Sequence, residues 1–207
     1  MSASEHLITT VDELEALYGT PSGPAVAKEV DRLTMGYRAM IEAAPFAVIA
    51  TVGPEGVDCS PKGDPAGFTL VLDDRTIAIP ERPGNRRADG FRNILSNPHV
   101  GLLYLIPGRG DTLRINGRAR LLSDADFFDR MVVKGHRPKV AVLVEIEEVF
   151  HHCSKAFLRS ALWKPESWHP EAMASRALIS QTLERKDESL EALEAYYGPS
   201  YAEKIYR

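Results

Sequence analysis

Residues 46–60 decide the fold, and they read Phe46-Ala47-Val48-Ile49-Ala50-Thr51-Val52-Gly53-Pro54-Glu55-Gly56-Val57-Asp58-Cys59-Ser60. The first seven residues are rich in β-branched and apolar types, which favour a strand. The Gly-Pro-Glu-Gly sequence then marks a turn, and a second strand begins at Val57. This stretch therefore predicts a β-hairpin.

The same pattern continues outward along the chain. Further strands are expected over residues 68–72, 76–79, 100–106, 112–122 and 139–149. Helical spacing is confined to residues 86–96, a short stretch after Ser123, and the two ends of the chain. Short strands at this spacing are typical of an antiparallel barrel, not of a parallel sheet. We expect a helical N-terminal extension over 1–44, a barrel over 45–150, and a helical C-terminal extension over 151–207.

Composition narrows the function classes. The chain has 207 residues and a formal net charge of −4, so no global basic field attracts nucleic acid or an anionic membrane. No run of 18 apolar residues and no signal peptide is found, which predicts a cytoplasmic protein with no membrane span. Two distant cysteines form no disulfide framework. Any anionic ligand must be held by a local group of basic residues.

One segment gathers such basic residues, and it reads Ile79-Pro80-Glu81-Arg82-Pro83-Gly84-Asn85-Arg86-Arg87. It leaves a strand and enters a helix, whose first backbone N–H groups and positive dipole end favour an anion. Arginine side chains match phosphate oxygens in bidentate geometry. The segment predicts a phosphate site, and the alternative is a solvated basic loop in which Asn85 is a simple N-cap.

Other polar clusters admit two interpretations. Ser60 and Lys62 could contact a phosphate, or Lys62 could pair with Asp64 in an ordinary turn. Thr112 belongs to the polar face of an alternating strand, which becomes a site only if a ligand or a second subunit covers it. Lys155 and Arg159 share one helical face, and their like charges call for an anionic ligand or a partner's carboxylate.

Metal and nucleophile chemistry are not expected. His151, His152 and Cys153 are adjacent on a strand, so they point to opposite faces, and no second pair completes a tetrahedral metal set. Cys153 as a nucleophile beside His152 lacks an identifiable third residue to orient the pair. No catalytic residue is assigned from the sequence.

The order of these segments resembles the pyridoxamine 5′-phosphate oxidase-like family of FMN-binding split barrels. The resemblance covers about residues 45–168. It rests on the following segments: Ser60-Pro61-Lys62-Gly63-Asp64, Ile79 to Arg87, Asn93-Ile94-Leu95-Ser96-Asn97-Pro98, Thr112 to Ala119, and His152-Cys153-Ser154-Lys155-Ala156-Phe157-Leu158-Arg159-Ser160-Ala161-Leu162-Trp163-Lys164-Pro165. The last segment is similar to a bacterial branch of the family.

The resemblance implies a mainly β fold, a six-stranded antiparallel split β-barrel, with helical extensions. It also implies a homodimer with two FMN clefts at its interface. The cofactor-binding positions it implies are Ser60, Lys62, Pro80, Arg82, Asn85, Arg86, Arg87 and Thr112, with Lys155 and Arg159 near the flavin or an anionic substrate. The family's flavin-facing glutamine falls on Thr112, whose hydroxyl has less reach.

Two departures bear on the reaction. Pyridoxamine phosphate oxidases carry a Ser-Arg-Lys phosphate turn, which is longer here, and they end in a substrate-gripping strand that helices replace here. Vitamin B6 oxidation is therefore not expected. The leading hypothesis is an FMN-dependent oxidoreductase acting on a small molecule or redox donor. The alternatives are a non-catalytic flavin-binding protein for storage or sensing, a split barrel that uses deazaflavin or heme, and an empty barrel with a basic patch.

Overall fold

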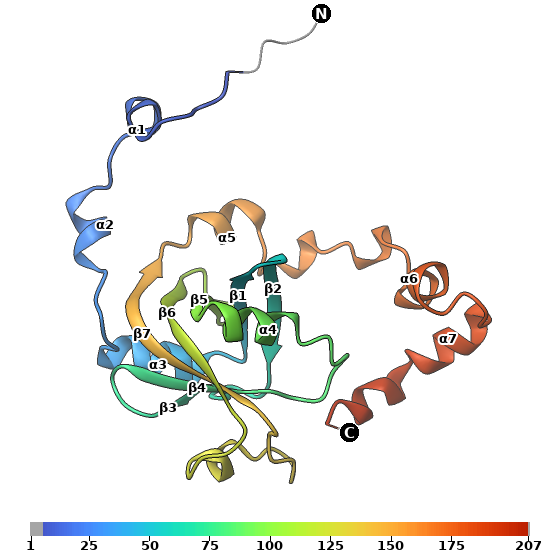
Figure 1. Cartoon of the computed structure of the whole chain (residues 1–207). Coiled ribbons are helices and arrows are strands. Elements are labelled where there is room, and N and C mark those ends of the chain that lie inside the picture. The colour runs from blue at the N-terminus through green and yellow to red at the C-terminus, as the bar shows by residue number, and fades with distance from the viewer. Residues whose placement is uncertain (1–5, 207) are drawn as a thin grey trace, which may run out of the picture.

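The computed structural model describes residues 6–206, and its centre is one antiparallel sheet of seven strands (Figure 1). The strand order in the sheet is β2-β1-β5-β6-β7-β4-β3. The strands are β1 (Phe46–Gly53), β2 (Gly56–Gly63), β3 (Leu70–Val71), β4 (Thr76–Pro80), β5 (His99–Leu105), β6 (Thr112–Leu122) and β7 (Ala141–His152). The predicted hairpin is confirmed as β1 and β2.

The sheet curls until its two ends approach each other. Lys62 on β2 is paired with Glu81 just after β4, and Asp64 after β2 is paired with Arg82. β2 and β4 are nevertheless not joined by ladder hydrogen bonds, so the barrel is split at this seam. The predicted split barrel is confirmed. The strand expected over residues 68–72 is the two-residue β3, which brings the sheet to seven strands, one more than the family resemblance implies.

Alternation along the strands fills the barrel with apolar side chains. In β5, the side chains of Val100, Leu102 and Tyr104 are buried and those between them are more exposed, as a period of two requires. The largest fully buried side chains are Tyr104, Phe128, Ile41, Ile77, Ile79, Leu113, Ile115, Ile146, Leu193, Val142, Val144 and Val149. Burying each such side chain stabilises the fold by roughly 1.5–3 kcal/mol.

A β-bulge bends the long β6–β7 ribbon. The register shifts between Asn116 and Gly117. A Cβ atom on Gly117 would lie 2.1 Å from the backbone oxygen of Glu145. Glycine is therefore required where the two strands approach most closely, and the bend lets the sheet close on itself.

Helices cover the barrel and extend from it. The N-terminal helices are α1 (Val11–Tyr18), α2 (Gly23–Ala27) and α3 (Met35–Ala43), and a capping box formed by Thr10 and Glu13 begins α1. α4 (Asp89–Ser96) packs on β1. A 3-10 turn, η1 (Phe128–Met131), lies between β6 and β7.

The C-terminal residues form an arm that loops away from the barrel, and its end returns beside the segment that follows β4 (Figure 1). α6 and α7 pack against each other. The arm contains α5 (Lys155–Ser160), η2 (Pro165–Ser167), η3 (Pro170–Ala172), α6 (Arg176–Leu183), α7 (Leu190–Tyr196) and η4 (Pro199–Lys204). Within residues 6–206, no helix has both the length and the apolar character needed to cross a bilayer.

Candidate functional site

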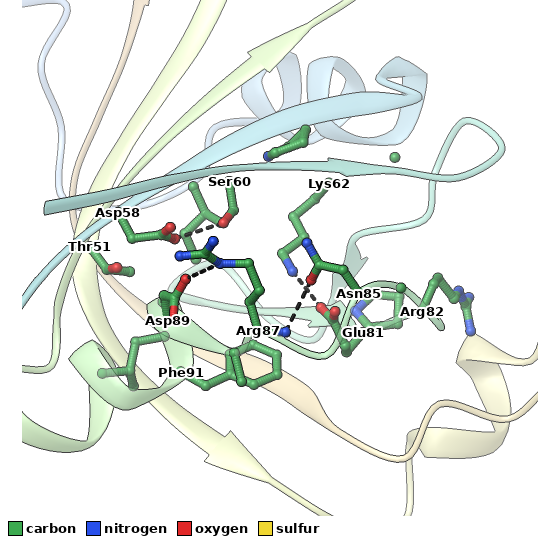
Figure 2. A pocket seen from close by; sticks show the side chains of 18 of the residues that line it. Thr51, Asp58, Ser60, Lys62, Glu81, Arg82, Asn85, Arg87, Asp89 and Phe91 are labelled. Carbon is green, nitrogen blue, oxygen red and sulfur yellow. Dashed lines mark hydrogen bonds and ion pairs between the residues drawn. The ribbon is translucent and has the colours of Figure 1, made fainter. Parts of the chain in front are cut away.

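The segment between β4 and α4, residues 81–88, separates two cavities. The first has a volume of about 420 Å³ and lies between β1, β2, this loop and α4 (Figure 2). Its charged and polar lining residues are Thr51, Asp58, Ser60, Lys62, Glu81, Arg82, Asn85, Arg87 and Asp89. The apolar part of the wall includes Ile49, Phe68, Phe91 and Ile94. A cavity of this size, with convergent polar groups at one end, is typical of a cofactor site.

The loop owes its shape to two strained residues. Arg86 and Ala88 both have left-handed backbone angles, with φ of 60° and 57°. Each costs on the order of 1 kcal/mol for a residue with a Cβ atom. The Asn85 side-chain oxygen accepts a hydrogen bond of 3.1 Å from the backbone N–H of Arg87, which holds the residue between them. Such strain tends to be retained where a loop must present its backbone to a ligand.

α4 begins directly at the cavity without a side-chain cap. Ala88 precedes the helix and supplies no capping oxygen, and Asp89, Gly90 and Phe91 of the first turn line the cavity. The N–H groups of a first turn have no partner inside the helix, and they carry the positive end of the helix dipole. This end of the cavity is therefore suited to an anion.

Close packing fixes the position of that helix. A Cβ atom on Gly53 would lie 2.2 Å from the side-chain oxygen of Asn93. A Cβ atom on Gly90 would lie 2.8 Å from an Asp58 oxygen. The Asn93 side chain is buried and donates to the hydroxyl of Thr51 at 3.1 Å. The first turn is thus held against β1 and β2.

The cations of the first cavity already have partners. Lys62 is paired with Glu81, and its ammonium lies 5.3 Å from the centre of the Phe91 ring. Arg87 donates to Asp89 at 2.7 Å, and this hydrogen bond raises the pKa of Arg87. The Arg87 side chain is 75% exposed, so it can exchange its partner without breaking a buried contact.

Arg82 is held more firmly than the other arginines. Its Nε donates to Asp64, and its terminal nitrogens donate to the backbone oxygens of Met131 at 2.8 Å and His136 at 3.4 Å. The Asp64 side chain is 1% exposed and that of Arg82 is 13% exposed. Figure 2 shows the Arg82 side chain directed away from Lys62 and Arg87. Arg82 therefore joins the end of β2 to the segment before β7.

The second cavity lies across residues 81–88 from the first and has a volume of about 620 Å³. Its opposite wall is formed by residues 136–140 and by the side chain of Tyr206 near the end of the chain. Arg86 lines this cavity and not the first. The two cavities share the loop, so a change of loop conformation alters both.

A family model described as pyridoxamine 5′-phosphate oxidase matches residues 33–153. The chain belongs to this family. No curated protein matches.

Three solved structures of low sequence identity are similar to this chain. HupZ of Group A Streptococcus is 19% identical, with 57% of this chain and 93% of that chain covered and a TM-score of 0.47. A candidate pyridoxamine 5′-phosphate oxidase of Lactobacillus delbrueckii is 24% identical, with coverages of 58% and 95% and a TM-score of 0.46. An FMN-binding protein of Syntrophomonas wolfei is 14% identical, with coverages of 56% and 88% and a TM-score of 0.43.

Seven of the ten cofactor-binding positions predicted from the sequence lie on the two cavities. Ser60, Lys62, Pro80, Arg82, Asn85 and Arg87 line the first, and Arg86 lines the second. The alternative of an ordinary turn at Ser60 to Asp64 is wrong, because Ser60 to Gly63 continue β2. Asn85 is not a simple N-cap of α4 either, because the residue preceding the helix is Ala88.

The other three of the ten predicted cofactor-binding positions line neither cavity. Thr112 is 4% exposed and pairs with His152 at the end of the β6–β7 ribbon. Lys155 and Arg159 are exposed on α5, which follows that ribbon. Within one chain, these side chains do not join the site around residues 81–88.

The structure adds site residues that the sequence reading missed. Asp58 accepts a hydrogen bond of 2.7 Å from Ser60, and Phe91 forms part of the apolar wall. The signal for Asp58 was present, because Asp58, Ser60 and Lys62 share one face of an alternating strand. Phe91 carries no comparable signal, because an apolar residue in an amphipathic helix is ordinarily a packing residue.

The histidines and cysteine at the end of β7 form no metal cluster. Among residues 6–206, no group of three or more His, Cys, Asp or Glu side chains could hold a metal ion. Burial lowers the pKa of His152, and the charges of Lys28 and Arg114 add to this effect. The pKa of the exposed Cys153 thiol is lowered, mainly by a hydrogen bond from the backbone of Lys155.

Proposed function

We propose that this protein binds FMN, with the phosphate held by the loop of residues 81–88 and the first turn of α4. The observation that carries the proposal is the uncapped start of α4, which lines the first cavity and follows the two strained residues Arg86 and Ala88. Uncapped N–H groups in a concave backbone are a common means of binding phosphate.

The remaining lining residues fit the other parts of the cofactor. Arg87, Lys62 and the Ser60 hydroxyl would hold phosphate oxygens and the polar chain that follows them. Ile49, Phe68 and Phe91 supply apolar surface for a planar ring system. The volume of about 420 Å³ lies in the range of small-molecule sites.

We further propose that a second copy of the chain completes the site. Thr112, Lys155 and Arg159 are the predicted positions that one chain leaves away from the cavities. α5 and the residues after it also expose apolar side chains, with Leu158 70% and Leu162 41% exposed. A homodimer that buries this segment would bring Lys155 and Arg159 of one subunit to the cavity of the other, whereas Thr112 is already covered within its own chain.

The proposed activity is that of a flavin-dependent oxidoreductase acting on a small molecule. FMN supplies the hydride or electron transfer in such enzymes, and the protein supplies binding, orientation and exclusion of water. Residues 81–88 and α4 would fix the cofactor, while Lys155 and Arg159 would orient an anionic substrate. Storage or sensing of flavin without turnover is the alternative, and it requires the same binding site.

The first experiment is an absorbance spectrum of the purified protein, with mass identification of the cofactor released on denaturation. Release of FMN would support the proposal, and release of deazaflavin or heme would contradict it. A protein that holds no cofactor and is not stabilised against heat by added FMN would also contradict it. In the matched pair of variants, Arg87→Ala should weaken FMN binding about tenfold or more because it removes a charge-assisted contact. Arg120 is an exposed residue on β6, and the control Arg120→Ala should leave FMN binding unchanged.

The second experiment separates an enzyme from a binding protein. Flavin that is bleached by reduced nicotinamide and reoxidised by air would support turnover. Flavin that stays oxidised with every donor, although it binds tightly, would favour storage or sensing.

A further inference from the structure

Tyr206 lines the second cavity together with the loop of residues 81–88. Of the residues that line the two cavities around residues 81–88, it is the one that comes from beyond β7. Its hydroxyl donates to Asp64. Its ring stacks on His136, with ring centres 5.7 Å apart and planes 18° apart, and the Lys134 ammonium lies 5.4 Å from its centre.

Asp64 carries this contact on to the loop. One oxygen of the buried carboxylate accepts the Tyr206 hydroxyl, and the other accepts Arg82 Nε. Arg82 is itself part of the loop, and its other nitrogens reach the backbone of Met131 and His136. Tyr206 is thus two hydrogen bonds away from the segment proposed to hold the phosphate.

The described part of the arm makes few hydrogen bonds to the barrel. Among the described residues, hydrogen bonds between residues 163–206 and residues 30–152 run through Trp163 and Tyr206. Trp163 donates to the backbone oxygen of Arg109 at 2.6 Å, at the start of the arm. The arm is therefore hydrogen-bonded to the barrel near its two ends, and the far hydrogen bond is to Asp64, the partner of Arg82.

We propose that Tyr206 is a positioning residue of the cofactor site, which acts through Asp64 and Arg82 to hold residues 81–88 in their phosphate-binding shape. The inference rests on the proposed function. The hydroxyl performs this role, while the ring closes the outer wall of the second cavity. The hydrogen bond to Asp64 raises the pKa of Tyr206.

The test compares FMN with riboflavin, which lacks the phosphate. The wild-type chain, Tyr206→Phe and Tyr206→Ala are each titrated with both compounds, and dissociation rates are followed by flavin fluorescence. Tyr206→Phe should speed FMN release about threefold to tenfold, because one hydrogen bond to a charged group is lost, and should leave riboflavin release unchanged. Tyr206→Ala should add a change for both compounds, because the ring is lost as well.

Tyr201→Phe is the matched control, since Tyr201 lies on the same arm, packs edge-on or tilted against Tyr196 and Tyr197, and lines neither cavity. It should leave both rates unchanged. Equal FMN release from Tyr206→Phe and the wild type would overturn the proposal, as would equal weakening of FMN and riboflavin. A wild-type chain that binds FMN no better than riboflavin would contradict the proposed phosphate site itself, so the two failures are distinguishable.

Discussion

Replacing Arg82 with alanine should destabilise the fold as a whole, in addition to loosening the loop of residues 81–88. The substitution removes the cation from a carboxylate, Asp64, that is 1% exposed. It also leaves the backbone oxygens of Met131 and His136 without this donor. The carboxylate would then keep a single hydrogen bond, from Tyr206.

The magnitude follows from these contacts. Removing one partner of a buried ion pair typically costs about 3–5 kcal/mol. The remaining Tyr206 donor and the 13% exposure of Arg82 reduce that cost, so we expect about 2–3 kcal/mol. For a chain of this length, that corresponds to a fall in Tm of about 5–10 °C.

Urea unfolding followed by circular dichroism measures this loss. Arg120→Ala is the control and should lie within about 0.5 kcal/mol of wild type, because its side chain is on the surface. Adding Asp64→Asn to Arg82→Ala should recover part of the loss, since no unpaired charge then stays buried. If Arg82→Ala keeps wild-type stability and instead loses FMN, then Arg82 is a phosphate ligand and the reasoning is wrong.

Three further perturbations test other parts of the structure. Gly117→Ala places a Cβ atom 2.1 Å from a backbone oxygen of β7 and should cost about 2–3 kcal/mol in urea unfolding, whereas Gly84→Ala, with its nearest neighbour at 3.9 Å, should cost little. The lowered pKa of His152 means that the unfolded chain binds its proton first, so the free energy of unfolding should fall as pH drops below about 6.5. His152→Gln should flatten that slope in unfolding titrations across pH 5 to 7.5, and an unchanged slope would exclude this source. Glu81→Gln should tighten FMN binding about threefold or more in a fluorescence titration, because it releases Lys62 and removes a negative charge, and weaker binding would show that Glu81 orients Lys62.

The local sequence pattern is sufficient to predict most strands of the barrel. The hairpin of residues 46–60 needed only β-propensity and a turn, and both act over a few residues. β2 runs on to Gly63 although Pro61 lies within it, because β2 is an edge strand and tolerates a missing N–H. The helix expected over residues 86–96 begins at Asp89, because the left-handed angles of Arg86 and Ala88 cannot belong to a helix.

The ion pairs of the site could not be predicted from local sequence patterns. The alternative in which Lys62 pairs with Asp64 is wrong, since Lys62 pairs with Glu81 and Asp64 pairs with Arg82, both across the split of the barrel. These partners are 18 or 19 residues apart, and only the curling of the sheet brings them together. The sequence therefore places the basic segment between β4 and α4, but the pairing of Arg82 with Asp64 could not be predicted from it.

The balance of charges in the first cavity has a consequence for how a ligand arrives. Three cations and three carboxylates line it, so the empty cavity carries no net formal charge. A phosphate is then not drawn in from a distance, and its association should respond weakly to ionic strength. Discrimination between anions would come from the short-range fit of backbone N–H groups and from Arg87 changing its carboxylate partner for the ligand. Selectivity in this protein would then be determined after contact, by the rate at which ligands leave.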